Sequence, residues 1–175
     1  MFAHGHKNIF RMNKKVKQSK MLKIFPAKTE QDFDIAKKLL VEYADSLGFH
    51  LRFQNFEEEL ANLPSVYVSP SGCLLLAVYK EQPVGCVGLR KLNDEVCEMK
   101  RLYVREQFRS LGIGRALVEA VIEKARKIDY NYMRLDTVPS MEVASALYAS
   151  VGFKNTGAYR YNPIEEAVFM ELKLV

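Results

Sequence analysis

Residues 109–114 read Arg109-Ser110-Leu111-Gly112-Ile113-Gly114, and they separate a strand-like stretch, Glu95–Val104, from a run with helical spacing, Gly112 to about Ile128. Main-chain N–H groups in the first turn of a helix have no partner within the helix, and the helix dipole adds partial positive charge there. The two glycines let an anion approach the backbone without meeting a Cβ atom, and Arg109 adds a charged donor. The segment therefore predicts a site for a phosphate or pyrophosphate group at a strand-to-helix turn.

Glycines at the start of a helix also serve as plain turn residues, so this signal alone leaves that alternative open. Two specific phosphate-binding motifs can be compared with the segment. A P-loop needs the pattern G-x-x-x-x-G-K-[ST], which nothing in the chain matches. The dinucleotide fingerprint G-x-G-x-x-G needs a small third residue, where this chain has Leu117. Neither nucleotide motif fits.

The segments around this turn predict an α/β fold with a mixed, mostly antiparallel central sheet. Apolar alternation and turn residues predict six strands, at Met21–Pro26, Cys73–Tyr79, Pro83–Arg90, Glu95–Val104, Tyr132–Thr137 and Ala167–Leu174. The strands on either side of the long helix should lie parallel, because a strand-helix-strand crossover in one sheet has that form.

Four helices are expected. Thr29 caps the first, which runs to Gly48, and a shorter helix covers Phe56–Leu63. The long helix carries a solvated ion pair between Glu123 and Lys127, four residues apart. The last helix, Ser140–Val151, is expected to be capped by Ser140 and stopped by Gly152.

The length of 175 residues fits one domain, residues 21–175, behind a leader of residues 1–20. Six of the 26 Lys and Arg residues lie in that leader, which has no acid. Residues 21–175 therefore hold 20 basic against 21 acidic residues, a net charge of −1. We expect the leader to be basic and disordered, or an extension ahead of a start at Met12 or Met21. A basic arm for RNA is a further alternative.

The three cysteines, Cys73, Cys86 and Cys97, each sit in an apolar run, as free thiols of a reducing compartment usually do. None has a Cys or His at metal-ligand spacing, so no metal site is expected. The longest apolar run, Cys73–Tyr79, is too short to span a bilayer. We therefore expect a soluble, cytoplasmic protein without a membrane partner.

Three motifs in order resemble the GNAT acetyltransferases. Arg109–Gly114 fits the family's [QR]-x-x-G-x-[GA] motif, Glu98–Val104 resembles the strand that pairs with the pantetheine arm, and Ala144–Phe153 resembles the A-x-x-L-Y-x-x-x-G-F segment. The resemblance covers about Ile24 to Leu174. One departure is Met141, where many members carry Asn, so the amide contact of those members with the coenzyme does not carry over.

The resemblance implies acetyl-CoA as co-substrate and transfer of its acetyl group to an amine. It implies that the coenzyme is bound by Leu102, Tyr103, Val104, Arg109, Ser110, Leu111, Gly112, Ile113, Gly114 and Arg115.

The resemblance also implies catalytic roles for two side chains. Glu98 would be the general base, directly or through water, and Tyr148 the general acid for the leaving thiolate. The alternatives are that Glu98 is solvated at an edge or pairs with Lys100 or Arg101, and that Tyr148 is a core residue. Backbone N–H groups near Leu102–Val104 would meet the thioester oxygen if the strand bulges there.

The acceptor amine, of a small molecule or a protein, should be bound by the early helices and by Phe153–Glu166. Within that segment, Tyr159–Asn162 either lines a pocket or forms the surface of a β-hairpin. Arg52 and Glu57–Glu59 either draw a cationic amine or form a solvated face.

Two other classes of function compete with an enzyme. A catalytically silent acyl-CoA-binding regulatory module would keep the phosphate site, and Met141 weakly favours it. A nucleic-acid-binding protein would use the leader, but the near-neutral remainder argues against a nucleic-acid partner. A homodimer is possible if the last strand is an exposed edge.

Overall fold

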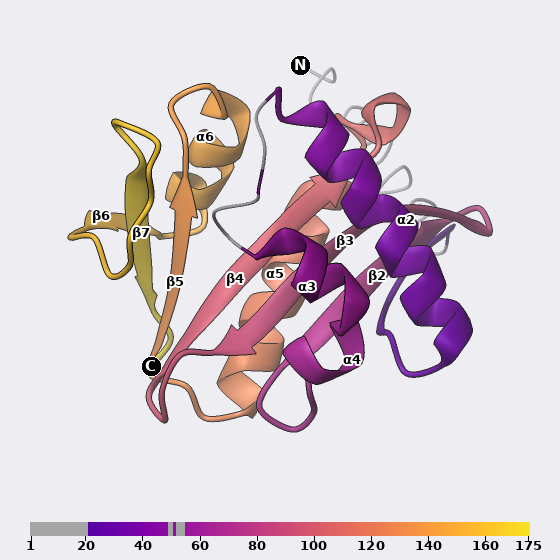
Figure 1. Cartoon of the computed structure of the whole chain (residues 1–175), viewed down its shortest axis with the longest axis horizontal. Helices are drawn as coiled ribbons and strands as arrows, with labels where there is room; N and C mark the ends of the chain where they lie inside the picture. The colour runs from indigo at the N-terminus through magenta and orange to yellow at the C-terminus, as the bar shows by residue number, and fades with distance from the viewer. Residues whose placement is uncertain (1–20, 49–50, 52–54) are drawn as a thin grey trace, which may run out of the picture.

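The computed structural model of the chain describes residues 21–48, 51 and 55–175 (Figure 1). The leader, residues 1–20, and Arg52 lie outside the described residues. In the described part, seven strands form one sheet: β1 (Leu22–Pro26), β2 (Cys73–Tyr79), β3 (Gln82–Lys91), β4 (Val96–Val104), β5 (Tyr132–Thr137), β6 (Lys154–Thr156) and β7 (Val168–Lys173).

The strands lie in the order β1-β2-β3-β4-β5-β7-β6. Every neighbouring pair is antiparallel except β4 and β5, which are parallel. The predicted fold class, a mixed and mostly antiparallel sheet with one parallel crossover, is confirmed. Strand β6 was not predicted, because its three residues are exposed and show no apolar alternation.

The helices are α2 (Glu30–Ser46), α3 (Phe56–Ala61), α4 (Leu63–Val66), α5 (Ile113–Lys127) and α6 (Glu142–Ser150), with a 3₁₀ turn, η2, at Glu106–Phe108. Thr29 caps α2 as predicted, and its hydroxyl accepts a hydrogen bond from the Asp32 N–H. The Glu123–Lys127 pair is also present, at 3.4 Å. The single helix expected at Phe56–Leu63 is interrupted at Asn62, which separates α3 from α4.

The prediction that Ser140 caps α6 is wrong. The N-cap residue is Met141, and it makes no side-chain cap bond. The Met141 N–H donates to the Val138 carbonyl at 2.9 Å, which closes a turn around Ser140. The Met141 carbonyl then accepts from Ser145 and begins the helix. Ser140 is therefore one residue too early to cap.

The sheet is covered on both faces, with α2, α3 and α4 on one and α5 on the other (Figure 1). Strand β2 shows why, because its side chains alternate between two cores. Leu75 and Ala77 pack in the core under α5, and Leu74 and Leu76 pack in the core under α2. Helix α6 adds Tyr148 to the α5 core.

All three cysteines are free and buried, as the sequence predicts. Burial raises the pKa of the Cys73 thiol to about 11 and that of Cys86 and Cys97 to about 12.

The premise of the dimer hypothesis is wrong, because the last strand is not an edge. Strand β7 pairs with β5 on one side and β6 on the other. The short β6 takes the edge position instead.

Among the described helices, none has the length and apolar character needed to cross a membrane.

One buried ion pair ties the helical layer to the centre of the sheet. Arg101 of β4 and Glu59 of α3 are 4% and 5% exposed, and Arg101 Nη2 lies 2.7 Å from Glu59 Oε2. The Tyr67 hydroxyl donates to Glu59 Oε1 at 2.6 Å. Burial alone would raise the pKa of Glu59, but the hydrogen bonds and charge of Arg101 outweigh it, and the pKa lies below its ordinary value.

We predict that Glu59→Ala lowers the free energy of unfolding by about 3 kcal/mol, because it leaves a buried guanidinium without its counter-ion. Glu58→Ala is the matched control, since Glu58 is an exposed neighbour in the same helix, and should change stability by less than about 0.5 kcal/mol. Urea unfolding measures both. Since the folded pKa of Glu59 is depressed, its contribution is present above the unfolded pKa and lost as the pH falls through the folded one. Equal effects of the two variants would contradict the prediction.

Candidate active site

The central feature of the site is an early divergence of β4 and β5. The two parallel strands pair only at Val96↔Tyr132, Cys97↔Met133 and Glu98↔Arg134. Strand β4 continues to Val104 and β5 to Thr137, so beyond Glu98 the two strands no longer bond to each other. A small cavity of about 50 Å³ opens there, lined by Tyr43, Met99, Lys100, Arg101, Leu102, Leu135, Asp136, Thr137, Met141 and Tyr148.

Strand β4 carries a β-bulge at the same level. Gly88 of β3 pairs with Lys100, but Cys86 pairs with Tyr103, so two residues of β4 oppose one of β3. Arg101 takes a left-handed conformation, with φ of 58°. The bulge resets the alternation, so that Leu102 packs with the core under α5 and Tyr103 with the core under α2. The bulge on which the predicted oxyanion contact depended is present, just before Leu102–Val104.

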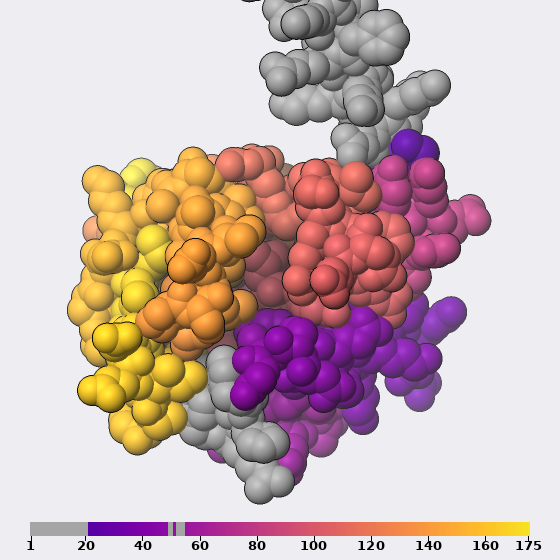
Figure 2. Space-filling model, turned by 90° about the horizontal axis from the view of Figure 1, so that it is seen from above, coloured from indigo at the N-terminus to yellow at the C-terminus, as the bar shows by residue number. Residues whose placement is uncertain are grey.

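A larger groove of about 810 Å³ lies beside the small cavity, and Tyr43, Leu102 and Met141 line both. Figure 2 shows it as a hollow between α2, the segment that leads into α5, and the start of α6. The groove therefore runs over the C-terminal end of β4 to the α5 N-terminus.

The glycine-containing turn has two residues in the left-handed conformation. Ser110 and Gly112 both have positive φ, 66° and 76°, and Gly112 is the N-cap of α5 without any side-chain cap bond. A Cβ atom on Gly112 would meet no atom within 4 Å, so this residue is open to the groove. Arg109 donates from Nε to the Val104 carbonyl at 3.1 Å, which holds its side chain at the groove.

Most of the predicted coenzyme-binding residues line this groove: Leu102, Tyr103, Val104, Arg109, Ser110, Gly112, Gly114 and Arg115. Two do not. Ile113 is 2% exposed within the core, and Leu111 packs partly buried against that core. Any contact of Ile113 with a ligand would therefore be through its main-chain N–H.

Tyr148 lines the small cavity rather than the large groove. It is 7% exposed, and its ring lies 5.9 Å from that of Phe153. Burial, with the nearby Tyr43 and Asp136, raises the pKa of the Tyr148 phenol well above its ordinary value. The core-residue alternative and the acid role are both compatible with this position, because the residue is buried and lines a cavity.

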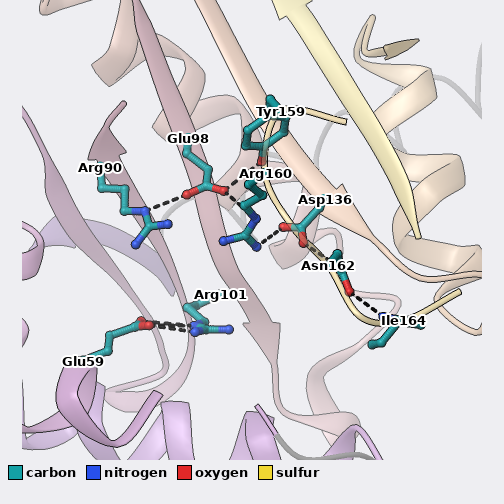
Figure 3. A network of polar contacts seen from close by, with 9 residues as sticks. All are labelled: Glu59, Arg90, Glu98, Arg101, Asp136, Tyr159, Arg160, Asn162 and Ile164. Atoms are coloured by element: carbon teal, nitrogen blue, oxygen red, sulfur yellow. Dashed lines mark hydrogen bonds and ion pairs between the residues drawn. The ribbon is translucent and has the colours of Figure 1, made fainter. Parts of the chain in front are cut away.

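Glu98 lies at the centre of a polar network (Figure 3). It is fully buried, which rules out the solvated edge, and Arg101 binds Glu59 instead. Arg90 donates from Nε to Glu98 Oε2 at 2.6 Å, and the Tyr159 hydroxyl donates to Oε1 at 2.8 Å. Arg160 Nε lies 3.5 Å from Oε1. Both carboxylate oxygens of Glu98 thus already have partners.

Asp136 of β5 is the second anchor of this network, and it was not among the residues predicted from the sequence. Arg160 and Asn162 both bond to its carboxylate, Asn162 at 2.9 Å. Burial raises the pKa of Asp136, but Arg160 and the other donors outweigh it and hold the pKa below its ordinary value. The alternation Arg134-Leu135-Asp136 in a strand was the available signal, since it places charges on one face.

The segment Tyr159–Asn162 lies in the connection between β6 and β7, which pair antiparallel as a hairpin. Tyr159, Arg160 and Asn162 turn toward Glu98 and Asp136, while Tyr161 is 82% exposed. The connection is therefore fixed to both of the strands that diverge.

Of the acidic cluster near the second helix, Glu59 is engaged with Arg101, and Glu57 and Glu58 are exposed. Among the described residues, no group of acidic, His or Cys side chains could hold a metal ion.

Comparison with known proteins identifies the family that this chain resembles. Residues 35–153 match the sequence profile of the Acetyltransferase (GNAT) family. An uncharacterised N-acetyltransferase of Schizosaccharomyces pombe is 40% identical over 155 residues, which cover 87% of this chain and 95% of that protein. Human N-acetyltransferase 8 is 34% identical over 129 residues, 70% of this chain and 53% of that protein.

A solved structure agrees with the sequence matches. A GNAT family acetyltransferase from Elizabethkingia anophelis, with acetyl-CoA bound, superposes with a TM-score of 0.65 at 25% identity. The match covers 87% of this chain and 97% of that one. The molecule is thus an enzyme of the acyltransferase class. The chain belongs to the GNAT family of N-acetyltransferases.

We predict that Gly114→Val weakens acetyl-CoA binding at least tenfold, about 1.4 kcal/mol, without unfolding the protein. A Cβ at this position would lie 3.7 Å from Leu147 and 3.9 Å from Val104, so the first carbon fits, and the two further carbons of valine add bulk at a residue that lines the groove. Isothermal titration with acetyl-CoA measures the affinity. The matched control is Glu123→Val, on an exposed face of the same helix. Unchanged affinity in Gly114→Val would show that the ligand does not approach this turn.

Proposed function

We propose that the protein transfers an acetyl group from acetyl-CoA to a primary amine of a small molecule or a protein, by direct attack in a ternary complex. One observation carries this proposal. The groove that contains the glycine turn meets the buried cavity that contains Tyr148, at the point where β4 and β5 diverge. A ligand held at the turn by its phosphates could therefore extend its thioester to the cavity.

The coenzyme would be held mainly by main-chain groups. Its pyrophosphate would bind the N–H groups at the start of α5, beside Arg109. The pantetheine arm would lie along the C-terminal end of β4, whose main chain no longer bonds to β5 beyond Glu98. The relative solved with acetyl-CoA supports this choice of co-substrate.

The chemistry requires a stabilised oxyanion and a protonated leaving group. We propose that main-chain N–H groups of Leu102–Val104, after the bulge, stabilise the oxyanion. Tyr148 would give its proton to the departing thiolate, and its raised pKa keeps that proton in place through the neutral range. Three unpaired buried thiols support the further proposal of a reducing, cytoplasmic location.

The test of this function has two stages. A thermal-shift series with acetyl-CoA and longer acyl-CoAs should raise the melting temperature, since ligand at 100 times its Kd adds about 2.7 kcal/mol. Thiol release is then measured with four acceptors: n-butylamine, spermidine, L-aspartate and a peptide with a free N-terminus. Thiol release with at least one of these acceptors would support the proposed acetyl transfer. Binding without release from any acceptor would favour the alternative, a silent acyl-CoA-binding regulatory module.

We predict that Tyr148→Phe lowers kcat by about 10²- to 10⁴-fold, the usual contribution of a general acid. Acetyl-CoA affinity should stay unchanged, because the ring is retained. Thiol-release kinetics and calorimetry separate the two quantities. Tyr130→Phe is the matched control, since its hydroxyl bonds to the Ser71 carbonyl and lines neither cavity. Wild-type turnover in Tyr148→Phe would remove the acid role.

A further inference from the structure

The small cavity that Tyr148 lines is also lined by a buried lysine, Lys100. Resting on the proposed acetyl transfer, we infer that Lys100 is the general base that takes a proton from the ammonium group of the acceptor.

Lys100 lies where such a base is needed. It is 6% exposed, and it lines the same cavity as Tyr148 and Leu102. The bulge of β4 follows it directly, so Leu102, the first of the proposed oxyanion donors, borders the same space of about 50 Å³ as Tyr148 and Lys100. An amine that attacks a thioester in this space would lie beside a residue that lines it, Lys100.

The other ionisable side chains of the cavity are poor bases. Burial raises the pKa of Tyr43 and of Tyr148, so both phenols keep their protons. Arg101 is permanently charged and bound to Glu59. Asp136 already accepts from Arg160 and Asn162, and its pKa is lowered. Among the described residues that line the cavity, Lys100 is the one best suited to accept a proton near neutral pH.

Glu98, the base implied by the family resemblance, is less well placed. It is fully buried, and it is absent from the cavity lining. Its two oxygens accept hydrogen bonds from Arg90 and Tyr159, and Arg160 lies 3.5 Å away. These contacts favour an anchoring role for Glu98, which fixes the β6–β7 connection to β4.

The electrostatic surroundings of Lys100 suit a base that works near neutral pH. Burial lowers the pKa of its amine to about 7, and the guanidinium groups of Arg101, Arg160 and Arg90 add to that effect. The carboxylate of Glu98 opposes it. The remaining charged groups of the neighbouring elements, Glu59 from α3 and Asp136 from β5, are each paired with an arginine. A base whose pKa lies near the working pH is the most effective.

The proton and electron balance of the step is complete. Neutral Lys100 removes one proton from R–NH₃⁺ and later releases it to solvent. The amine lone pair forms the C–N bond, and the carbonyl π pair moves to oxygen. The pair on oxygen then re-forms the carbonyl as the C–S bond breaks and its electrons leave with sulfur. The thiolate takes its proton from Tyr148, which regains one from the nitrogen of the new amide. The products are the acetylated amine, the free thiol and one proton.

The inference is tested by measuring kcat/KM against pH with the same four amines, in the full chain and in four variants. The wild type should lose activity as the pH falls through about 7, because Lys100 becomes protonated. Lys100→Met and Lys100→Arg should lose about 10²- to 10⁴-fold in kcat, together with that inflection, while acetyl-CoA affinity stays unchanged. Retained activity in Lys100→Arg would mean that only the charge matters, and would overturn the inference.

Glu98→Gln separates the two candidate bases. Because Glu98 raises the pKa of Lys100, its removal should move the inflection to lower pH but leave it in place. Disappearance of the inflection in this variant would assign the base to Glu98. Lys127→Met, an exposed lysine of α5, is the matched control and should keep the wild-type profile.

A measurement without acceptor keeps this inference distinct from the proposed function. ¹⁵N NMR of the lysine side chains, with the Lys100 signal assigned from Lys100→Arg, should show titration near pH 7. A Lys100 signal that titrates near the ordinary lysine value of about 10.4 would overturn the base role even if the enzyme is active. A rise in KM alone in Lys100→Met would also overturn it, since that result assigns acceptor binding. If the wild-type chain binds acetyl-CoA but releases no thiol with any of the four amines, that result would instead overturn the proposed function.

Discussion

The structure depends on a parallel strand pair that stops early. Strands β4 and β5 are bonded at three residue pairs, and beyond Glu98 each continues without the other. In a closed sheet the main-chain groups of β4 would be satisfied by its neighbour. Here they border the small cavity and the large groove, and helices α2 and α6 stand on either side. Both candidate catalytic side chains and the glycine turn are arranged around this opening.

The opening is held by paired charges. Glu98 on β4 and Asp136 on β5 both bind the connection between β6 and β7, through Tyr159, Arg160 and Asn162. The connection therefore bridges the two strands where their own hydrogen bonds end. Buried ion pairs add little net stability, because desolvation offsets their attraction. Their contribution here is to fix where one chain segment lies relative to the cavity.

Features set by local sequence were predicted well, and features set by distant contacts were not. The period-2 and period-3.6 patterns located α5 and every described strand except β6, and β5 has the predicted bounds, Tyr132–Thr137. The partners of Glu98 are 8 and 61 residues away in sequence, so no local pattern identifies them. The bulge does have a signal in the sequence. Adjacent Lys100 and Arg101 break the alternation of β4, and both lie buried because Arg101 takes a positive φ.

The burial of Cys73, Cys86 and Cys97 has a practical consequence. Thiol reagents react with the thiolate, and these three side chains are both enclosed and held in the neutral form. The folded chain should therefore not react with such a reagent. A molecule that unfolds should expose all three sulfur atoms to it. Mass spectrometry of the labelled protein over time would then give the rate at which each cysteine becomes exposed by unfolding.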